Sequence, residues 1–170
     1  MRRVRMPRGA LATCKDMSMP ALKPGSPAPD FSLPTGTGEV LSLKDLKGKK
    51  IVLYFYPKDN TSGCTKEACA FNDDLARVKK KGAVVIGVSP DSAVSHAKFS
   101  GKYDLTFPLL SDESKGMLKK YGVWKEKSMY GRKYMGVVRS TFIIDENGII
   151  THIFPKVTVD GHVDEVLAAL

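Results

Sequence analysis

The sequence is poor in cysteine and has no long apolar run. Three cysteines in 170 residues are too few for a small protein held together by disulfides. No apolar stretch approaches the about 20 residues that a membrane-spanning helix needs, and the longest, residues 51–56, has the length of a strand. A hydrophobic fraction of 42% excludes a chain that is disordered throughout, and the length fits one domain with its own core.

Acidic residues are in the minority, with 18 Asp and Glu against 27 Lys and Arg. Residues 1–18 hold five basic residues and one acidic residue, whereas the rest of the chain carries 22 basic and 17 acidic residues. We therefore expect residues 1–18 to be a basic leader, disordered or upstream of the native start, and residues 19–170 to be the folded domain. The leader is Arg-rich and acid-poor like an organelle transit peptide, but it is short and holds one Ser. Cys14 lies in it and is expected to be an accessory thiol.

The positive charge also allows a nucleic-acid-binding protein, which stays an alternative from a different class. Residues 19–170 have no helix-turn-helix pattern, no RNA-binding aromatic motif and no basic stripe, the features by which such proteins are identified. We therefore expect no nucleic-acid partner, no membrane association and a cytoplasmic location.

A strand pattern, a helix pattern and a second strand pattern follow one another in the middle of the chain. Residues 51–56 are a continuous apolar run that ends at Pro57, which is typical of a strand buried on both faces. Residues 61–80 have apolar side chains at helical spacing: Ala68, Phe71, Leu75 and Val78. Residues 83–88 are a second buried strand. The three segments together predict one β-α-β unit.

Shorter elements are predicted on either side of this unit. A hairpin precedes it, with strands at residues 31–33 and 40–43 around a Thr-Gly-Thr-Gly turn. After it come a helix over residues 92–99, a helix over residues 113–121 and a looser region over residues 122–137. Two strands follow at residues 140–144 and 149–154, joined by an Asn-Gly turn. A last helix, capped by Asp160, leads to the C-terminus. This order predicts an α/β protein of thioredoxin-like fold, a mixed central β-sheet flanked by helices with an N-terminal β-hairpin.

Cys64 falls in the first turn of the helix predicted over residues 61–80. Unpaired N–H groups and a partial positive charge at a helix N-terminus favour the thiolate, which is the reactive form of cysteine. Cys64 is also in phase with the apolar stripe, where a cysteine can be a small buried hydrophobic residue. Helix placement alone leaves both interpretations open.

The spacing of Cys64 and Cys69 separates the two thiols on an intact helix. Five residues of α-helix place their Cα atoms about 8.7 Å apart, whereas a disulfide tolerates at most about 7 Å. A Cys64–Cys69 bond therefore requires the first turns of the helix to unwind. A zinc site is not indicated, because there is no second cysteine pair and the histidines lack ligand spacing: His96, His152 and His162.

Around Cys64, the sequence resembles the peroxiredoxins. The segment Pro57-x-x-x-Thr61-x-x-Cys64 is similar to the active-site motif of that family, and Glu67 falls where the family often has Glu. Cys69 matches the bacterioferritin comigratory protein (peroxiredoxin Q) branch. The likeness covers the folded domain and includes further segments: residues 27–31, residues 121–124, and residues 138–145 around Arg139.

The resemblance implies a role for each matching residue. Cys64 would attack the peroxide and become a sulfenic acid. Arg139 and Thr61 would stabilise charge on the thiolate and on the leaving oxygen. Pro57 would shield the sulfur from water, and Glu67 would orient Arg139.

The resemblance also implies how the enzyme is recycled. Cys69 would be the resolving cysteine, forming a disulfide with Cys64 that an external dithiol, expected to be thioredoxin, reduces. No cofactor or metal is needed, because sulfur carries the redox chemistry. The expected assembly is a monomer or weak homodimer. A thiol–disulfide oxidoreductase stays the alternative within redox chemistry, although Cys-x-x-Cys is absent and Val138-Arg139 stands where a thioredoxin usually has a cis-Pro.

Overall fold

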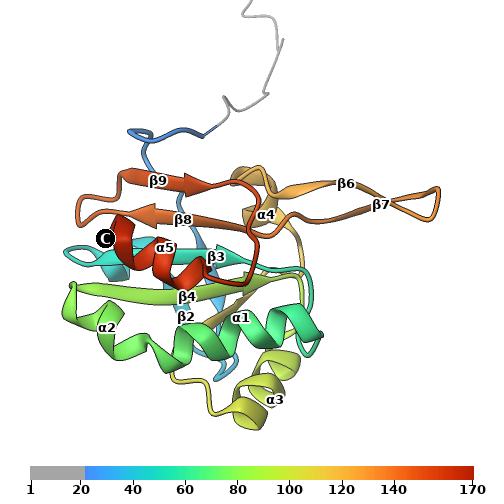
Figure 1. The fold of residues 1–170 in the computed structure, drawn as a ribbon, viewed down its shortest axis with the longest axis horizontal. Helices are drawn as coiled ribbons and strands as arrows, with labels where there is room; N and C mark the ends of the chain where they lie inside the picture. Colours follow the sequence, from blue (N-terminus) through green and yellow to red (C-terminus); the bar gives the residue numbers. More distant parts are fainter. Residues whose placement is uncertain (1–21) are drawn as a thin grey trace, which may run out of the picture.

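A five-stranded mixed sheet forms the centre of the computed structural model, which describes residues 22–170 (Figure 1). The strand order is β5-β4-β3-β8-β9, with β3 parallel to β4 and antiparallel to β8. Its strands are β3 (Lys50–Phe55), β4 (Ala83–Ser89), β5 (Leu109–Ser111), β8 (Ser140–Ile144) and β9 (Ile150–Phe154). The sheet confirms the predicted thioredoxin-like α/β class and the parallel β-α-β unit. The predicted leader and Cys14 lie outside the described residues.

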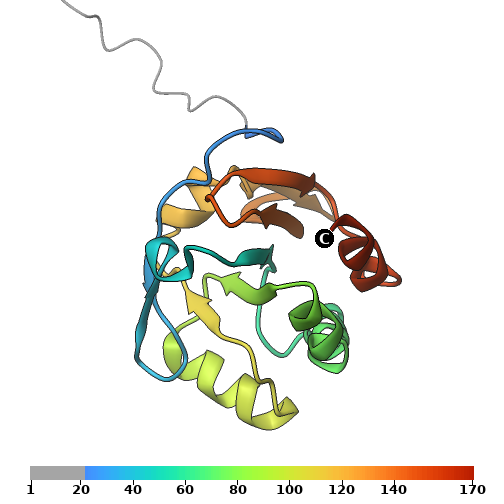
Figure 2. The same ribbon diagram turned by 90° about the vertical axis from the view of Figure 1, so that its left-hand side faces the viewer.

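Both faces of the sheet are covered, because alternate side chains of β3 enter two different cores. Val52 and Tyr54 pack with α1 (Ser62–Asp73), α2 (Leu75–Lys80) and α5 (His162–Ala169). Leu53 and Phe55 pack on the opposite face with α4 (Gly116–Lys120) and the N-terminal segment. Figure 2 shows α1, α2 and α5, in green and red, together on one side of the sheet. The continuous apolar run of β3 is the sequence signature of this double burial.

The prediction of a single helix over residues 61–80 is wrong in one respect, because the structure divides this segment into two helices at Asp74. Asp74 has φ −97° and ψ 11°, ending α1, and its carbonyl accepts the N–H of Val78 at the start of α2. Aspartate competes with helical hydrogen bonding and favours such boundary positions. Leu75 and Val78 stay buried, so the apolar stripe continues across the break.

The prediction of a looser region over residues 122–137 is also wrong. It forms an antiparallel hairpin, β6 (Trp124–Met129) and β7 (Arg132–Val137), which projects from the body (Figure 1). Tyr130 and Gly131 at its tip have φ of 51° and 75°, the pair of positive values that matches the twist of a two-residue hairpin. Most of its side chains are exposed on both faces. The hairpin therefore lacks the apolar–polar alternation by which half-buried strands are predicted.

The remaining elements follow the predicted order with shifted ends. The N-terminal hairpin is present as β1 (Ser32–Pro34) and β2 (Val40–Ser42), followed by the short helix η1 (Leu43–Leu46). The helix α3 (Ala93–Tyr103) is longer than predicted. Asp160 does not cap α5, which follows Gly161 at φ 75°, and the Asp160 carboxylate pairs with Lys66 instead. Among residues 22–170, no helix has the length and apolar character needed to cross a membrane.

Candidate active site

Cys64 lies in the first turn of α1, a few residues beyond the end of β3. Thr61 is the N-cap residue, and its carbonyl accepts the N–H of Thr65 at 2.9 Å. The thiol is 1% exposed. N–H groups in the first turn of a helix have no intrahelical partner, so the local dipole favours negative charge near Cys64.

Arg139 approaches Cys64 from the link between β7 and β8. Its Nη2 donates to Cys64 Sγ at 3.2 Å, across 75 residues of sequence. Gly63 makes room for this contact, since a Cβ there would lie 3.2 Å from Nη2. The guanidinium places a permanent positive charge at the sulfur, where it can stabilise negative charge that develops during a reaction. The close approach of the guanidinium to Gly63 is a feature that sequence reasoning missed.

Glu67 lies one turn further along α1 and faces the other side of the same guanidinium. Its Oε1 is 3.3 Å from Arg139 Nη1, and the carboxylate is 1% exposed. The two groups pair by distance and charge, but the contact is not aligned as a hydrogen bond, and within residues 22–170 neither carboxylate oxygen accepts one. Burial raises the pKa of Glu67 to about 7, against the opposing effect of Arg139. Glu67 thus changes charge in the neutral range beside the arginine that contacts the thiol.

Replacing Glu67 with Gln should remove a pH dependence of stability. A folded-state pKa of about 7 against 4.5 means that the folded protein binds more protons in this window, so wild-type stability falls as pH rises from 4.5 to 7. This shift corresponds to about 3 kcal/mol of unfolding free energy. Urea denaturation of both proteins across this range checks it. Parallel stability–pH curves for wild type and Glu67→Gln would contradict it.

Cys69 lies on α1 beyond Glu67 and is half-buried. Burial raises the pKa of its thiol, and Asp73 raises it further. Cys64 and Cys69 are both free, and the helix between them is intact. With α1 intact, the spacing of Cys64 and Cys69 predicts that the two thiols form no disulfide.

Pro57 and Thr61 lie in the loop between β3 and α1, which we call the 57–61 loop. Pro57 is half-buried and Thr61 is exposed. The Thr61 hydroxyl donates to the Lys58 carbonyl at 3.1 Å, so it supports the loop instead of capping the helix by its side chain. The structure thus brings Arg139 into contact with both Cys64 and Glu67. Pro57 and Thr61 lie close to Cys64 in the sequence, in the loop that precedes α1.

Lys127 is a further cation near the site that sequence reasoning missed. It lies on β6 in the region interpreted as loose, and it is half-buried. Burial lowers the pKa of Lys127, the charge of Arg139 lowers it further, and Cys64 opposes them. Strand β6 of the projecting hairpin therefore carries a cation within electrostatic reach of the thiol.

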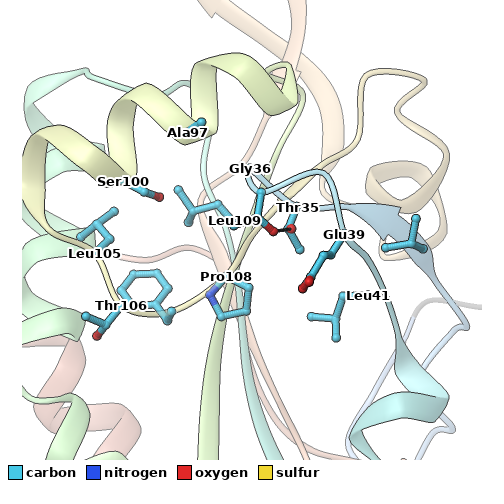
Figure 3. A pocket seen from close by; sticks show the side chains of 13 residues that line it. Thr35, Gly36, Glu39, Leu41, Ala97, Ser100, Leu105, Thr106, Pro108 and Leu109 are labelled. Carbon is cyan, nitrogen blue, oxygen red and sulfur yellow. Dashed lines mark hydrogen bonds between the residues drawn. The ribbon is translucent and has the colours of Figure 1, made fainter.

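A groove of about 530 Å³ lies elsewhere, between the β1–β2 hairpin and α3 (Figure 3). Thr35 and Leu41 line it from the hairpin, and Ala97 and Leu105 from α3 and the segment that follows it. None of the residues predicted for the site lines this groove. The candidate site is instead the thiol at the N-terminus of α1 and the guanidinium beside it.

Known proteins resemble this chain over most of its length. A model of the AhpC/TSA family matches residues 24–153. A bcp-type peroxiredoxin of Coxiella burnetii is 53% identical over 150 residues, 88% of this chain and 99% of the relative. The peroxiredoxin Bcp of Bacillus subtilis is 49% identical over 146 residues, 86% and 93% of the two chains.

Solved structures resemble the chain in the same way. Peroxiredoxin Q from Xanthomonas campestris, as a cysteine-to-serine mutant, superposes with a TM-score of 0.79 at 43% identity, covering 82% of this chain and 88% of that one. A trapped intermediate/ligand complex of the bacterioferritin comigratory protein of the same organism, described for its alkyl peroxide reduction activity, gives a TM-score of 0.78 at 42% identity and the same coverage.

Proposed function

Because this chain belongs to the AhpC/TSA family and is a peroxiredoxin of the bacterioferritin comigratory protein (peroxiredoxin Q) branch, it is a thiol-dependent peroxidase, and we propose that Cys64 is the residue that reduces the peroxide. The observation that carries this proposal is the 3.2 Å contact between Arg139 Nη2 and Cys64 Sγ in the first turn of α1. The proposed substrates are hydrogen peroxide and organic hydroperoxides. The activity described for the Xanthomonas relative supports the second class.

In the first step, the Cys64 thiolate attacks one oxygen of the peroxide. A sulfur–oxygen bond forms, the oxygen–oxygen bond breaks, and the leaving oxygen takes a proton to become water or an alcohol. Negative charge moves from sulfur to the leaving oxygen during this step. Arg139 and the free N–H groups of the first turn lie where they can stabilise both ends of that movement.

Glu67 is proposed to orient the guanidinium. Its carboxyl lies 3.3 Å from Nη1, while Nη2 contacts the sulfur. Pro57 and Thr61 are proposed to shield and polarise the peroxide from the 57–61 loop. These assignments extend the family motif to the positions that match it in this chain.

In the second step, the Cys69 thiolate attacks the sulfenic sulfur of Cys64. A sulfur–sulfur bond forms, the sulfur–oxygen bond of the sulfenic acid breaks, and the departing hydroxide takes up the proton that the Cys69 thiol gave up and becomes water. The disulfide protects Cys64 from irreversible oxidation. An external dithiol, proposed to be thioredoxin, then reduces this disulfide by exchange and supplies the two electrons of the cycle.

The second step requires α1 to unwind, and this requirement can be used to test the proposed cycle. One equivalent of peroxide should give a Cys64–Cys69 disulfide, identified by peptide mass spectrometry, and a loss of helical far-ultraviolet circular dichroism. An intact helix holds the two Cα atoms about 8.7 Å apart, which is beyond the reach of a disulfide.

The matched control is Cys69→Ser, in which Cys64 can be oxidised but cannot form this bond. It should keep its helical signal after the same treatment. Identical spectra for oxidised and reduced wild type, with the disulfide present, would contradict unwinding. Absence of the disulfide would contradict the role of Cys69.

We also propose that the enzyme is a cytoplasmic monomer or weak homodimer with residues 19–170 as its domain. The peroxide substrate and a thiol reductant follow from the family, and the choice of thioredoxin is part of the proposal.

A further inference from the structure

A buried polar cluster lies behind the 57–61 loop and takes no part in the chemistry described above. Its centre is His96 on α3, which is 0% exposed. Nδ1 of His96 is 2.7 Å from Asp59 Oδ2, and Nε2 is 2.9 Å from the Leu110 carbonyl of β5. A carboxylate and a carbonyl only accept hydrogen bonds, so each ring nitrogen of His96 faces an acceptor. His96 thus ties Asp59 to the edge of the central sheet.

Asp59 receives two further hydrogen bonds. The Tyr56 hydroxyl donates to Oδ1 at 2.6 Å, and the Ser95 hydroxyl donates to Oδ2 at 2.8 Å. Burial raises the pKa of Asp59, but the hydrogen bonds from His96 and Tyr56 outweigh it and hold the pKa below its usual value. The carboxylate is therefore charged and fully bonded inside the protein.

The backbone of the loop is held as well. The Asp59 N–H donates to Asp91 Oδ2 at 2.8 Å, and Asp91 is itself bonded by the Ser89 hydroxyl of β4 at 2.6 Å. Asn60 adopts a left-handed φ of 63°, and its Oδ1 lies 3.3 Å from both Lys102 Nζ and the Tyr103 hydroxyl of α3. An unfavourable backbone angle persists where surrounding contacts hold it. Two successive residues of the loop are thus attached to α3 and β4.

Asp59, Asp91 and His96 lie close enough together to suggest metal ligands, since their ligand atoms are within 4.8 Å of one another. Both oxygens of Asp59 and both nitrogens of His96 already pair with protein atoms. The cluster is therefore complete as a hydrogen-bond network. Only its member Asp59 lies between Pro57 and Thr61 in the sequence, and this residue relates the cluster to the shape of the loop.

We propose that Tyr56, Asp59 and His96, which we call the loop anchor, are positioning residues that hold the 57–61 loop in the shape required for peroxide reduction. The inference rests on the proposed function of Cys64. Arg139 reaches the thiol from the β7–β8 link, a different part of the chain, so the anchor governs the loop and not the charge on sulfur.

The test compares two rates of Cys64 in single-turnover experiments. One is the rate of oxidation by hydrogen peroxide, and the other is the rate of alkylation by iodoacetamide, which needs a thiolate but no peroxide geometry. In His96→Asn and Tyr56→Phe, the ratio of peroxide rate to alkylation rate should fall about ten- to a hundredfold, because a small misplacement of positioning groups has effects of this size. General loosening of the fold would change exposure of the thiol to both reagents and leave the ratio near its wild-type value.

Tyr121→Phe is the matched control for Tyr56→Phe. Tyr121 is 3% exposed, and its hydroxyl donates to the Pro29 carbonyl at 2.7 Å, away from the 57–61 loop. This variant should lose similar stability and keep the wild-type ratio. The inference is overturned if the anchor variants keep the wild-type ratio or if Tyr121→Phe lowers it equally.

Two provisions keep the test decisive. If His96→Asn does not fold, Tyr56→Phe and Ser95→Ala carry the comparison, since each removes one donor to Asp59. If wild-type Cys64 itself does not react with peroxide, the proposed function of Cys64 fails. This outcome differs from one in which the wild type reacts and the anchor variants keep its rate ratio, which overturns the role of the loop anchor alone.

Discussion

Replacing Cys64 with Ser should abolish peroxide turnover. The expected loss is roughly 10⁴-fold or more, because the variant lacks the nucleophile on which the proposed mechanism depends. A serine hydroxyl is not ionised near neutral pH, even beside Arg139 and the N-terminus of α1. The measurement is peroxide consumption coupled to thioredoxin, thioredoxin reductase and NADPH.

Cys69→Ser provides the comparison for this result. It keeps Cys64, so it should consume about one equivalent of peroxide in a single turnover and then recycle poorly with thioredoxin. The two serine variants thus separate the oxidation step from the recycling step. Full activity of Cys64→Ser would mean that the peroxide reacts elsewhere.

Replacing Arg139 with Met should lower the rate of Cys64 oxidation by about 10²- to 10³-fold, the usual cost of removing one donor that stabilises charge in a transition state. The variant removes the cation 3.2 Å from the sulfur, and with it the charge that stabilises the leaving oxygen. Stopped-flow oxidation of Cys64 by hydrogen peroxide measures this rate.

Arg139→Met also leaves the Glu67 carboxyl without its buried counter-ion, which can destabilise the fold independently of catalysis. The double variant Arg139→Met with Glu67→Gln removes that difficulty and should recover stability but not rate. Arg77→Met is a suitable control, because Arg77 is an exposed cation on α2. An oxidation rate within a few-fold of wild type in the double variant would exclude Arg139 from the reaction.

The central β-α-β unit was predictable because its evidence is local. An apolar run buried on both faces identified β3, and helical spacing identified the face that α1 and α2 bury. The division at Asp74 was not predicted, since the apolar spacing continues across it. The β6–β7 hairpin was missed because most of its side chains face solvent and give no alternation.

The candidate site divides in the same way. Cys64, Cys69 and the 57–61 loop lie within 13 consecutive residues, so motif and spacing could identify them. The limit on a disulfide in an intact helix also follows from spacing alone. Glu67 could be assigned by its place in the motif, but its raised pKa depends on burial against the sheet.

By itself, the sequence predicted the fold class, its likeness to the family motif nominated Cys64 and Cys69 as the reacting thiols, and their spacing predicts that α1 must unwind for them to bond. Each of these follows from periodicity or from residues close together in the chain. Only the tertiary structure decided what surrounds the thiol: Arg139 reaches it across 75 residues, and His96 reaches Asp59 across 37. Such contacts are set by how the sheet orders its strands, and no local pattern encodes that distance.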